Sequence, residues 1–271
     1  MNVRKALTYI REHGDALARA RAEALLAWTP PPAEVVASLE QAQSAEGGWP
    51  AGLEAGRPPD IAGTTAVLFA LLDLGLESHP MAQGGLAFLQ AQQVQDGGWP
   101  AAAALPYPPW RGEGEPPAEG LRLYATAVVS SLLVAYGRAE GESADHALDL
   151  LLDRQLEGGV FLGFPRHTAW YALPLLARRL GLRSGPAQNI VSTLSVEVAG
   201  GGWFPSMFAA MLRSLLLAGF GMETPLVRLA WEQLLMRQRE DGAWESESGP
   251  ADDIRSTLEV LWCWRKIIVQ R

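Results

Sequence analysis

A seven-residue pattern, in which a glutamine is followed after three residues by Gly-x-Trp, recurs along the chain and constrains its fold more than any other feature. Three intact copies occur, at Gln43–Trp49, Gln93–Trp99 and Gln238–Trp244. Phe161 replaces the tryptophan in one altered copy, and Glu197 replaces the glutamine in another. The segment 5–10, which is followed by a break at 13–15, is a candidate sixth copy. Such self-similarity predicts a repeat architecture.

Each copy follows an amphipathic helix and precedes an apolar one. In 81–93, Leu86, Phe88 and Leu89 form an apolar stripe at helical spacing, and glycines then end the helix. The segments after the breaks carry few charges, as buried helices do; they are 64–75, 126–137, 168–181, 207–221 and 257–269. No segment shows the alternation of a strand. Each repeat is expected to be an outer helix, a glycine-rich turn and an inner buried helix.

Hairpins of this kind cannot bury their apolar faces alone, so they are expected to stack. The copies predict an all-α fold, an (α/α)6 barrel (toroid) of about six helical hairpins in a single domain over 1–271, with a central cavity inside the inner helices. An open solenoid is the alternative, but the strongly apolar inner helices favour closure. A Pro- and Gly-rich insert at 100–120 precedes an inner helix. It is expected to be either a lid over the cavity mouth or a loose surface loop.

The repeated Gln-x-x-x-Gly-x-Trp pattern resembles the QW repeat of squalene–hopene cyclases, oxidosqualene cyclases and related prenyltransferase-like α/α barrels. The resemblance covers residues from about 5 to 268 and rests on several copies. It implies a terpene cyclase-like protein that binds, and in its active form cyclises, an isoprenoid (a polyprenyl chain or its diphosphate) in an apolar cavity. A non-catalytic isoprenoid- or lipid-binding or scaffold toroid is the alternative. A glycan-active α/α barrel ranks last, because the inner helices carry few carboxylates.

The repeat tryptophans Trp49, Trp99, Trp203 and Trp244 are expected to be structural. A glutamine amide can bond free backbone groups at a neighbouring helix end, and an indole can pack over it. The aromatic residues of the inner helices are the candidates for contact with substrate, because a ring facing a cavity stabilises a cation through its π face. These are Trp170, Tyr171, Phe208 and Trp262, with ordinary core packing as the alternative.

The resemblance also implies an acid, since the cyclases protonate an alkene or epoxide with the middle aspartate of Asp-x-Asp-Asp-Thr at the start of an inner helix. The segments 60–64 and 253–257 keep the first aspartate and the threonine but not the middle aspartate. Asp60 and Asp253 are therefore candidate catalytic residues, with helix capping as the competing role. His167, before another inner helix, is a third candidate proton donor. The missing middle aspartate counts against ordinary protonation-initiated cyclisation.

Four arginines are candidate substrate-binding residues. Arg122, Arg166 and Arg255 fall at the starts of inner helices, where one rim of a closed ring would attract a diphosphate. Arg213 interrupts the apolar run 207–219 and needs a partner or a ligand. An internal ion pair, with Asp73 or Glu259, is favoured over a ligand contact.

Composition and charge narrow the functional classes to which the protein can belong. The net charge of −8 argues against a nucleic-acid binder. Cys263 is the only cysteine, and the sequence contains no Asp-x-Cys pair, so neither a zinc site nor another cofactor is expected. The charged N-terminus is unlike a signal peptide, and no uninterrupted apolar run reaches the roughly 18 residues of a membrane span. We expect a cytoplasmic protein with an isoprenoid ligand; peripheral membrane contact and the oligomeric state stay open.

Overall fold

The computed structural model describes residues 1–27 and 29–269, and within them the chain is helical with no strand. Three single-turn 3-10 helices, η1 (Ala51–Leu53), η2 (Glu157–Gly159) and η3 (Pro250–Asp252), lie in the connections. The α-helices are α1 (Val3–His13), α2 (Ala16–Ala27), α3 (Ala33–Ala42), α4 (Ile61–Asp73), α5 (Pro80–Ala91), α6 (Ala118–Ala135), α7 (Glu142–Arg154), α8 (Pro165–Leu180), α9 (Gly185–Ala199), α10 (Pro205–Ala218), α11 (Pro225–Met236) and α12 (Asp253–Val269).

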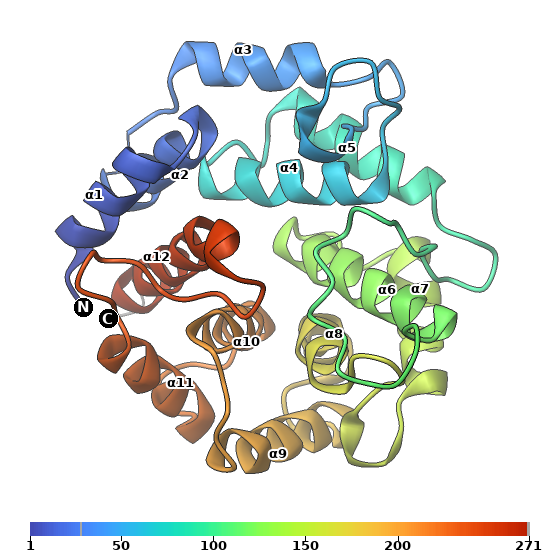
Figure 1. Cartoon of the computed structure of the whole chain (residues 1–271). Helices are drawn as coiled ribbons and strands as arrows, with labels where there is room; N and C mark the ends of the chain where they lie inside the picture. Colours follow the sequence, from blue (N-terminus) through green and yellow to red (C-terminus); the bar gives the residue numbers. More distant parts are fainter. Residues whose placement is uncertain (28, 270–271) are drawn as a thin grey trace.

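The helices form two concentric rings, with the even-numbered helices inside and the odd-numbered helices outside (Figure 1). Each inner helix packs against the next one, and α12 packs against α2, so the ring is closed. The segment 5–10 lies in the outer helix α1, and α2 is its inner partner. The predicted all-α barrel is thus confirmed, and the open solenoid is excluded by the contact between α12 and α2.

The two ends of the chain are joined by the last copy of the repeat. The Gln238 side chain accepts a hydrogen bond from the Asn2 backbone N–H at 2.7 Å and donates one to the Asn2 carbonyl at 2.9 Å. Lys5 adds a bond from Nζ to the Glu240 carbonyl at 2.9 Å. These contacts place the C-terminal hairpin beside the N-terminal one, as Figure 1 shows.

The same glutamine contact recurs in the intact internal copies. Gln43 Nε2 donates to the carbonyl of Gly47 in its own turn at 2.7 Å and to the carbonyl of Met81 in the next outer helix at 2.8 Å. The indole of Trp49 donates to the Leu39 carbonyl at 2.8 Å, at the end of its own outer helix. The Gln93 and Trp99 side chains repeat this arrangement. The glutamine thus joins its own turn to the first turn of the next outer helix, and the indole bonds a carbonyl in the last turn of its own outer helix, where carbonyls lack an intrahelical partner.

The first glycine of the motif is required by a close approach of two backbones. Gly97 has φ of +88°, and a Cβ there would lie 2.2 Å from the carbonyl oxygen of His146 in α7. A Cβ at Gly47 would likewise lie 2.5 Å from the carbonyl oxygen of Gly84 in α5. A side chain at either position would push the next outer helix away, so the glycine sets the spacing between neighbouring hairpins.

Most inner helices begin several residues earlier than their apolar segments predict. The side chain of Asp60 caps α4 by accepting from the Gly63 N–H at 2.7 Å, and α6 starts at Ala118, inside the predicted insert. With 18 residues, α6 is long and apolar enough to span a membrane. The sequence did not indicate such a helix, because it contains no uninterrupted apolar run of that length. Because 67% of it is buried inside the protein, we assign it as a core helix of the ring.

Candidate functional site

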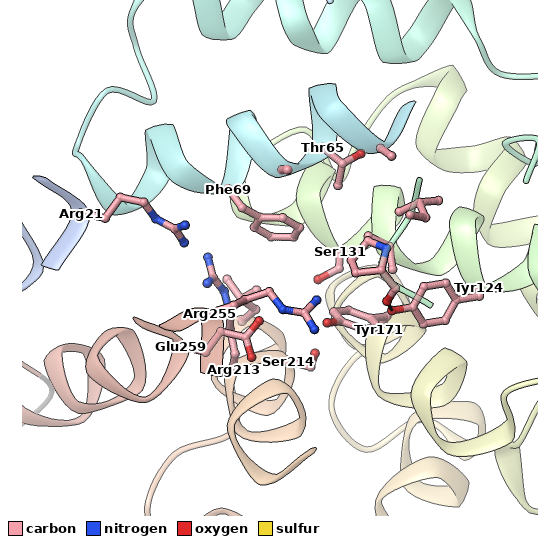
Figure 2. Close-up of a pocket in the computed structure, with 16 residues that line it drawn as sticks. Arg21, Thr65, Phe69, Tyr124, Ser131, Tyr171, Arg213, Ser214, Arg255 and Glu259 are labelled. Atoms are coloured by element: carbon pink, nitrogen blue, oxygen red, sulfur yellow. Dashed lines mark hydrogen bonds between the residues drawn. The ribbon is translucent and has the colours of Figure 1, made fainter. Parts of the chain in front are cut away.

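The inner ring encloses a cavity of about 130 Å³ to which all six inner helices contribute. Figure 2 shows polar and aromatic side chains converging on it. The charged and hydroxyl-bearing residues of its wall are Arg21, Thr65, Tyr124, Ser131, Tyr171, Arg213, Ser214, Arg255 and Glu259. Phe69, Leu105, Val128 and Leu217 supply much of the apolar wall. The wall of the cavity is therefore mainly apolar, with charged and hydroxyl groups set into it.

A buried ion cluster closes one end of this cavity. Asp73 at the end of α4 is fully buried and lies 2.6 Å from Nη2 of Arg21 and 3.4 Å from Nη2 of Arg213. The guanidinium of Arg213 lies between two rings, 4.9 Å from the centroid of Phe69 and 4.7 Å from that of Trp262. Asp73 is thus the internal partner that the buried Arg213 requires.

Three buried polar groups at the cavity lack a hydrogen-bond partner. They are Oγ1 of Thr65, Oγ of Ser214 and Nε of Arg213, from residues that are at most 6% exposed. Buried polar groups in native proteins are nearly always satisfied by protein or by ordered water. The three atoms are themselves almost inaccessible to solvent, so water or a polar ligand group would reach them only after a small movement of the neighbouring side chains.

Glu259 is the only acid in the wall of this cavity within the described residues. Its carboxyl group forms no hydrogen bond or ion pair there, although Arg255 precedes it by one helical turn on α12. Burial raises the pKa of Glu259 above its ordinary value, while the positive charges of Arg255 and Arg213 oppose the increase. The carboxyl is therefore biased towards its protonated form.

A smaller chamber of about 30 Å³ adjoins the cavity at the rim where the inner helices begin. Tyr124, Tyr171, Arg255 and Glu259 line both spaces and thus form the wall between them. On the rim side, Nε2 of His167 lies 2.9 Å from Oε1 of Glu247, and Trp170 packs 4.4 Å from the His167 ring. The indole N–H of Trp170 and the hydroxyl of Ser256 have no partner there.

Comparison with known proteins assigns the fold. No family model matches the sequence, and no curated protein matches it. The type II terpene cyclase MstE from Scytonema superposes with a TM-score of 0.63 over 99% of this chain and 98% of that chain, at 17% identity. The chain has a terpene cyclase-like fold. At this level of identity the likeness establishes the architecture alone.

Two further structures share this terpene cyclase-like fold. A protein from Actinoplanes has a TM-score of 0.63 at 18% identity and covers 98% of both chains. The ent-copalyl diphosphate synthase from Streptomyces platensis has a TM-score of 0.55 at 20% identity, over 93% of this chain and 50% of that chain. MstE has also been solved in complex with its substrate, geranylgeranyl dihydroxybenzoate, and its product, merosterolic acid A.

Two of the predicted acids lie outside the cavity wall of the terpene cyclase-like ring. Asp60 caps α4 and pairs through its backbone with Trp49. Asp253 is buried, accepts from the Ser246 N–H at 2.8 Å and forms an ion pair with Arg239. Both carboxylates are thus held by local structural contacts. His167 lines the rim chamber rather than the main cavity.

The predicted arginines divide into two groups. Arg255 and Arg213 line the cavity. Arg122 forms ion pairs with Asp96 and Glu119, and Arg166 pairs with Glu197 and lies over the Trp203 ring. Arg122 and Arg166 are absent from the lining of both central spaces, so the structure does not gather the predicted ring of arginines at the rim.

The predicted aromatic residues also occupy different places. Tyr171 lines both central spaces, and Trp170 lines the rim chamber. Trp262 flanks Arg213 and lines an opening of about 310 Å³ at the far end of the ring. Phe208 packs against Trp203 outside these spaces. Contact of these side chains with a substrate stays a prediction.

The insert covers the rim. Leu105 is buried and, together with Pro106, lines the central cavity. The hydroxyl of Tyr124 donates to the Pro106 carbonyl at 3.1 Å, and Tyr107 stacks 5.8 Å from Phe164. The insert is therefore packed against the rim, and its role as a lid stays a prediction.

Glu259, Thr65, Ser214 and Arg21 were not among the predicted site residues. The sequence suggested Glu259 only as a possible ion-pair partner of Arg213, but Arg213 forms its ion pair with Asp73. The sequence feature that could have indicated Glu259 is its position within the apolar segment 257–264, four residues after Arg255. Among the described residues no three His, Cys, Asp or Glu side chains gather as a metal site would require. Cys263 is buried, and burial raises the pKa of its thiol.

Proposed function

We propose that the protein binds an isoprenoid with an anionic head in its central cavity. One observation carries this proposal: the guanidinium group of Arg213 and the hydroxyl groups of Thr65 and Ser214 belong to residues that line one cavity with a largely apolar wall. A carboxylate or phosphate oxygen would accept hydrogen bonds from these groups, and Arg255 would add charge. The apolar wall would take the adjoining hydrocarbon chain.

The size of the cavity limits how such a ligand lies. A volume of about 130 Å³ compares with roughly 150 Å³ for an engineered cavity that holds one benzene ring. The cavity would therefore hold one group of about that size, either the head or a single isoprene unit. The rest of the chain would extend past Arg213 and Leu217 into the opening of about 310 Å³, which shares these two residues.

The fold comparison supports the same ligand class. The substrate bound to MstE joins a geranylgeranyl chain to a dihydroxybenzoate head. An isoprenoid with an acidic head thus occupies a cyclase of the same architecture. For this chain, the arginines of the cavity are the groups that would select such a head.

Calorimetric titration with geranylgeranyl diphosphate, and with the uncharged geranylgeraniol, tests the proposal. The diphosphate is expected to bind at least about 10-fold more tightly, since hydrogen bonds to charged groups are worth about 1.5–3 kcal/mol each. Ala66→Phe, which fills the cavity from α4, is expected to abolish binding of both. Ala87→Phe on the exposed face of α5 is the matched control. Equal affinity for the two ligands, or unchanged binding by Ala66→Phe, would contradict the proposal.

A non-catalytic carrier is the second candidate function. It is favoured by the structural contacts that hold Asp60 and Asp253 away from the cavity. Product analysis after incubation with geranylgeranyl diphosphate and geranylgeranyl dihydroxybenzoate separates the two functions. A carrier binds these compounds and returns them unchanged, whereas a cyclase converts one of them into a cyclic isomer.

A further inference from the structure

We infer that Glu259 is the acid that starts cyclisation of the isoprenoid, and that it regains its proton from the rim through water in the chamber beside it. The inference rests on the proposed function, because it places the alkene in the central cavity. It assigns the acid to the interior of α12 rather than to the start of an inner helix.

Geometry distinguishes the half-buried Glu259 from the two buried acids of the inner helices. Asp73 is held by two arginines, and Asp253 is held by Arg239 and the Ser246 N–H. Glu259 alone among these three has no partner among the described residues, and it lines both the cavity and the chamber. A proton on Glu259 can therefore face an alkene on one side and water on the other.

The surrounding charges suit this role. Arg255 precedes Glu259 on α12, Arg213 faces it from α10, and the more distant Arg21 and Asp73 are bound to each other. Tyr124 and Tyr171 face it from α6 and α8, and burial raises the pKa of both hydroxyls, so they stay neutral. Burial raises the pKa of Glu259 and so favours its protonated form, and the two arginines stabilise the carboxylate that remains after transfer.

The step balances without a further reagent. The O–H bond of Glu259 breaks, and the π electron pair of the alkene forms the new C–H bond. The neighbouring carbon becomes a cation, which the next double bond attacks to close a ring. A proton then leaves a carbon beside the final cation and passes to water, so the product is an isomer of the substrate.

The chamber provides the return path for the proton. Its volume of about 30 Å³ suits one or two waters, since a water needs at least about 10–15 Å³ on this measure. Polar residues of its wall, among them His167, Ser246 and Glu247, would hold such water. His167 and Glu247 line the same chamber, and Nε2 of His167 lies 2.9 Å from Oε1 of Glu247, within hydrogen-bond distance. Protons from the rim can thus reach Glu259 without crossing the main cavity.

The first experiment compares the wild type with Glu259→Gln, using geranylgeranyl diphosphate and geranylgeranyl dihydroxybenzoate as probes in D2O. The wild type is expected to form a cyclic product with one deuterium at the protonated carbon. Glu259→Gln is expected to lose at least about 100-fold in turnover, within the range for a general acid, and to bind the probes within about 3-fold of wild type. Glu232→Gln, on the exposed face of α11, is the charge-matched control and keeps full turnover.

Infrared spectroscopy gives a reading that needs no turnover. The wild type at neutral pH is expected to show a protonated-carboxyl band that shifts in D2O and is missing in Glu259→Gln. Absence of this band in the wild type overturns the assignment. Asp60→Asn is expected to leave turnover unchanged, because Asn still caps a helix; loss of turnover in this variant would move the acid to Asp60.

The return path has its own test. Glu247→Gln is expected to leave the rate of a single turnover within about 3-fold of wild type and to slow repeated turnovers about 10-fold or more, because only reprotonation is impaired. Equal slowing of both rates overturns the relay and assigns Glu247 a structural role.

Failure of the inference and failure of the proposed function give different results. If neither probe binds, the proposed function is overturned, and the acid assignment falls with it. If a probe binds and no cyclic product forms, or if Glu259→Gln retains turnover, only the acid assignment is overturned.

Discussion

Arg213 of α10 and Asp73 of α4 meet across the inner ring, with 3.4 Å between Nη2 and Oδ1, and Asp73 is fully buried. Arg21 of α2 binds the second oxygen of the same carboxylate at 2.6 Å. One acid thus compensates two buried cations from different inner helices. The cluster joins three of the six hairpins at the end of the cavity.

Asp73→Asn is therefore expected to destabilise the protein strongly. The substitution would leave Arg21 and Arg213 charged and without a carboxylate, and breaking a buried ion pair in this way costs about 3–5 kcal/mol. Urea unfolding would measure the change in the free energy of unfolding. Asp149→Asn, on the exposed face of α7, is the control and is expected to stay within about 0.5 kcal/mol of wild type. A loss below about 1 kcal/mol for Asp73→Asn would contradict this account of the cluster.

Gly97→Ala is expected to cost more stability than an alanine at another left-handed glycine. Both Gly97 and Gly137 have positive φ, so either substitution carries a backbone strain of about 1–2 kcal/mol. Only at Gly97 would the added Cβ meet backbone, 2.2 Å from the His146 carbonyl, whereas Gly137 has open space. Thermal unfolding of the two variants compares them directly. Equal losses would show that the contact between neighbouring hairpins does not matter.

Glu259 is expected to make stability fall as pH rises. Burial raises the pKa of its carboxyl in the folded chain, whereas in the unfolded chain the pKa is about 4.3. Between the two values the folded state holds a proton that the unfolded state has released, so the free energy of unfolding decreases with pH. Glu259→Gln removes this contribution and is expected to lose less stability than wild type as pH rises above the unfolded-state value of about 4.3. An identical pH dependence of the two proteins would place the pKa of Glu259 near its ordinary value.

Tyr124→Phe is expected to loosen the insert. The change removes the hydrogen bond from the Tyr124 hydroxyl to the Pro106 carbonyl, which is worth about 1 kcal/mol. Trypsin should then cut faster after Arg111, the exposed arginine of the insert. Tyr136→Phe is the matched control, because its hydroxyl bonds the Leu68 carbonyl away from the insert. If both variants were cut at the wild-type rate, the hydrogen bond would not hold the insert.

The fold followed from the sequence because the repeat specifies contacts between hairpins. Gln43 bonds the Met81 carbonyl of the next outer helix and Trp49 bonds the Leu39 carbonyl of its own outer helix, so one copy predicts the arrangement of the others. The starts of the inner helices were less predictable. Asp60 begins α4 through a capping bond, whereas the apolar segment that revealed the helix starts only at Thr64.

The site was harder to predict than the fold because a helix that is buried all round gives no sign of which face meets the cavity. Asp253 and Glu259 lie on the same helix, and only Glu259 lines the cavity. Arg122 and Arg255 both lie near the start of an inner helix, but Asp96 and Glu119 hold Arg122 outside the lining. These outcomes depend on neighbours brought together by folding.

The contact between Gln238 and Asn2 has a topological consequence. A glutamine side chain joins the last hairpin to the first in the same way as it joins neighbouring hairpins within the chain. The same ring could therefore form from a chain that starts and ends at another turn between hairpins. A circular permutant that links the present termini and opens the chain at another turn, such as the one around Gly75, should keep every inter-hairpin contact. The order of the hairpins around the ring, rather than the position of the termini, defines this molecule.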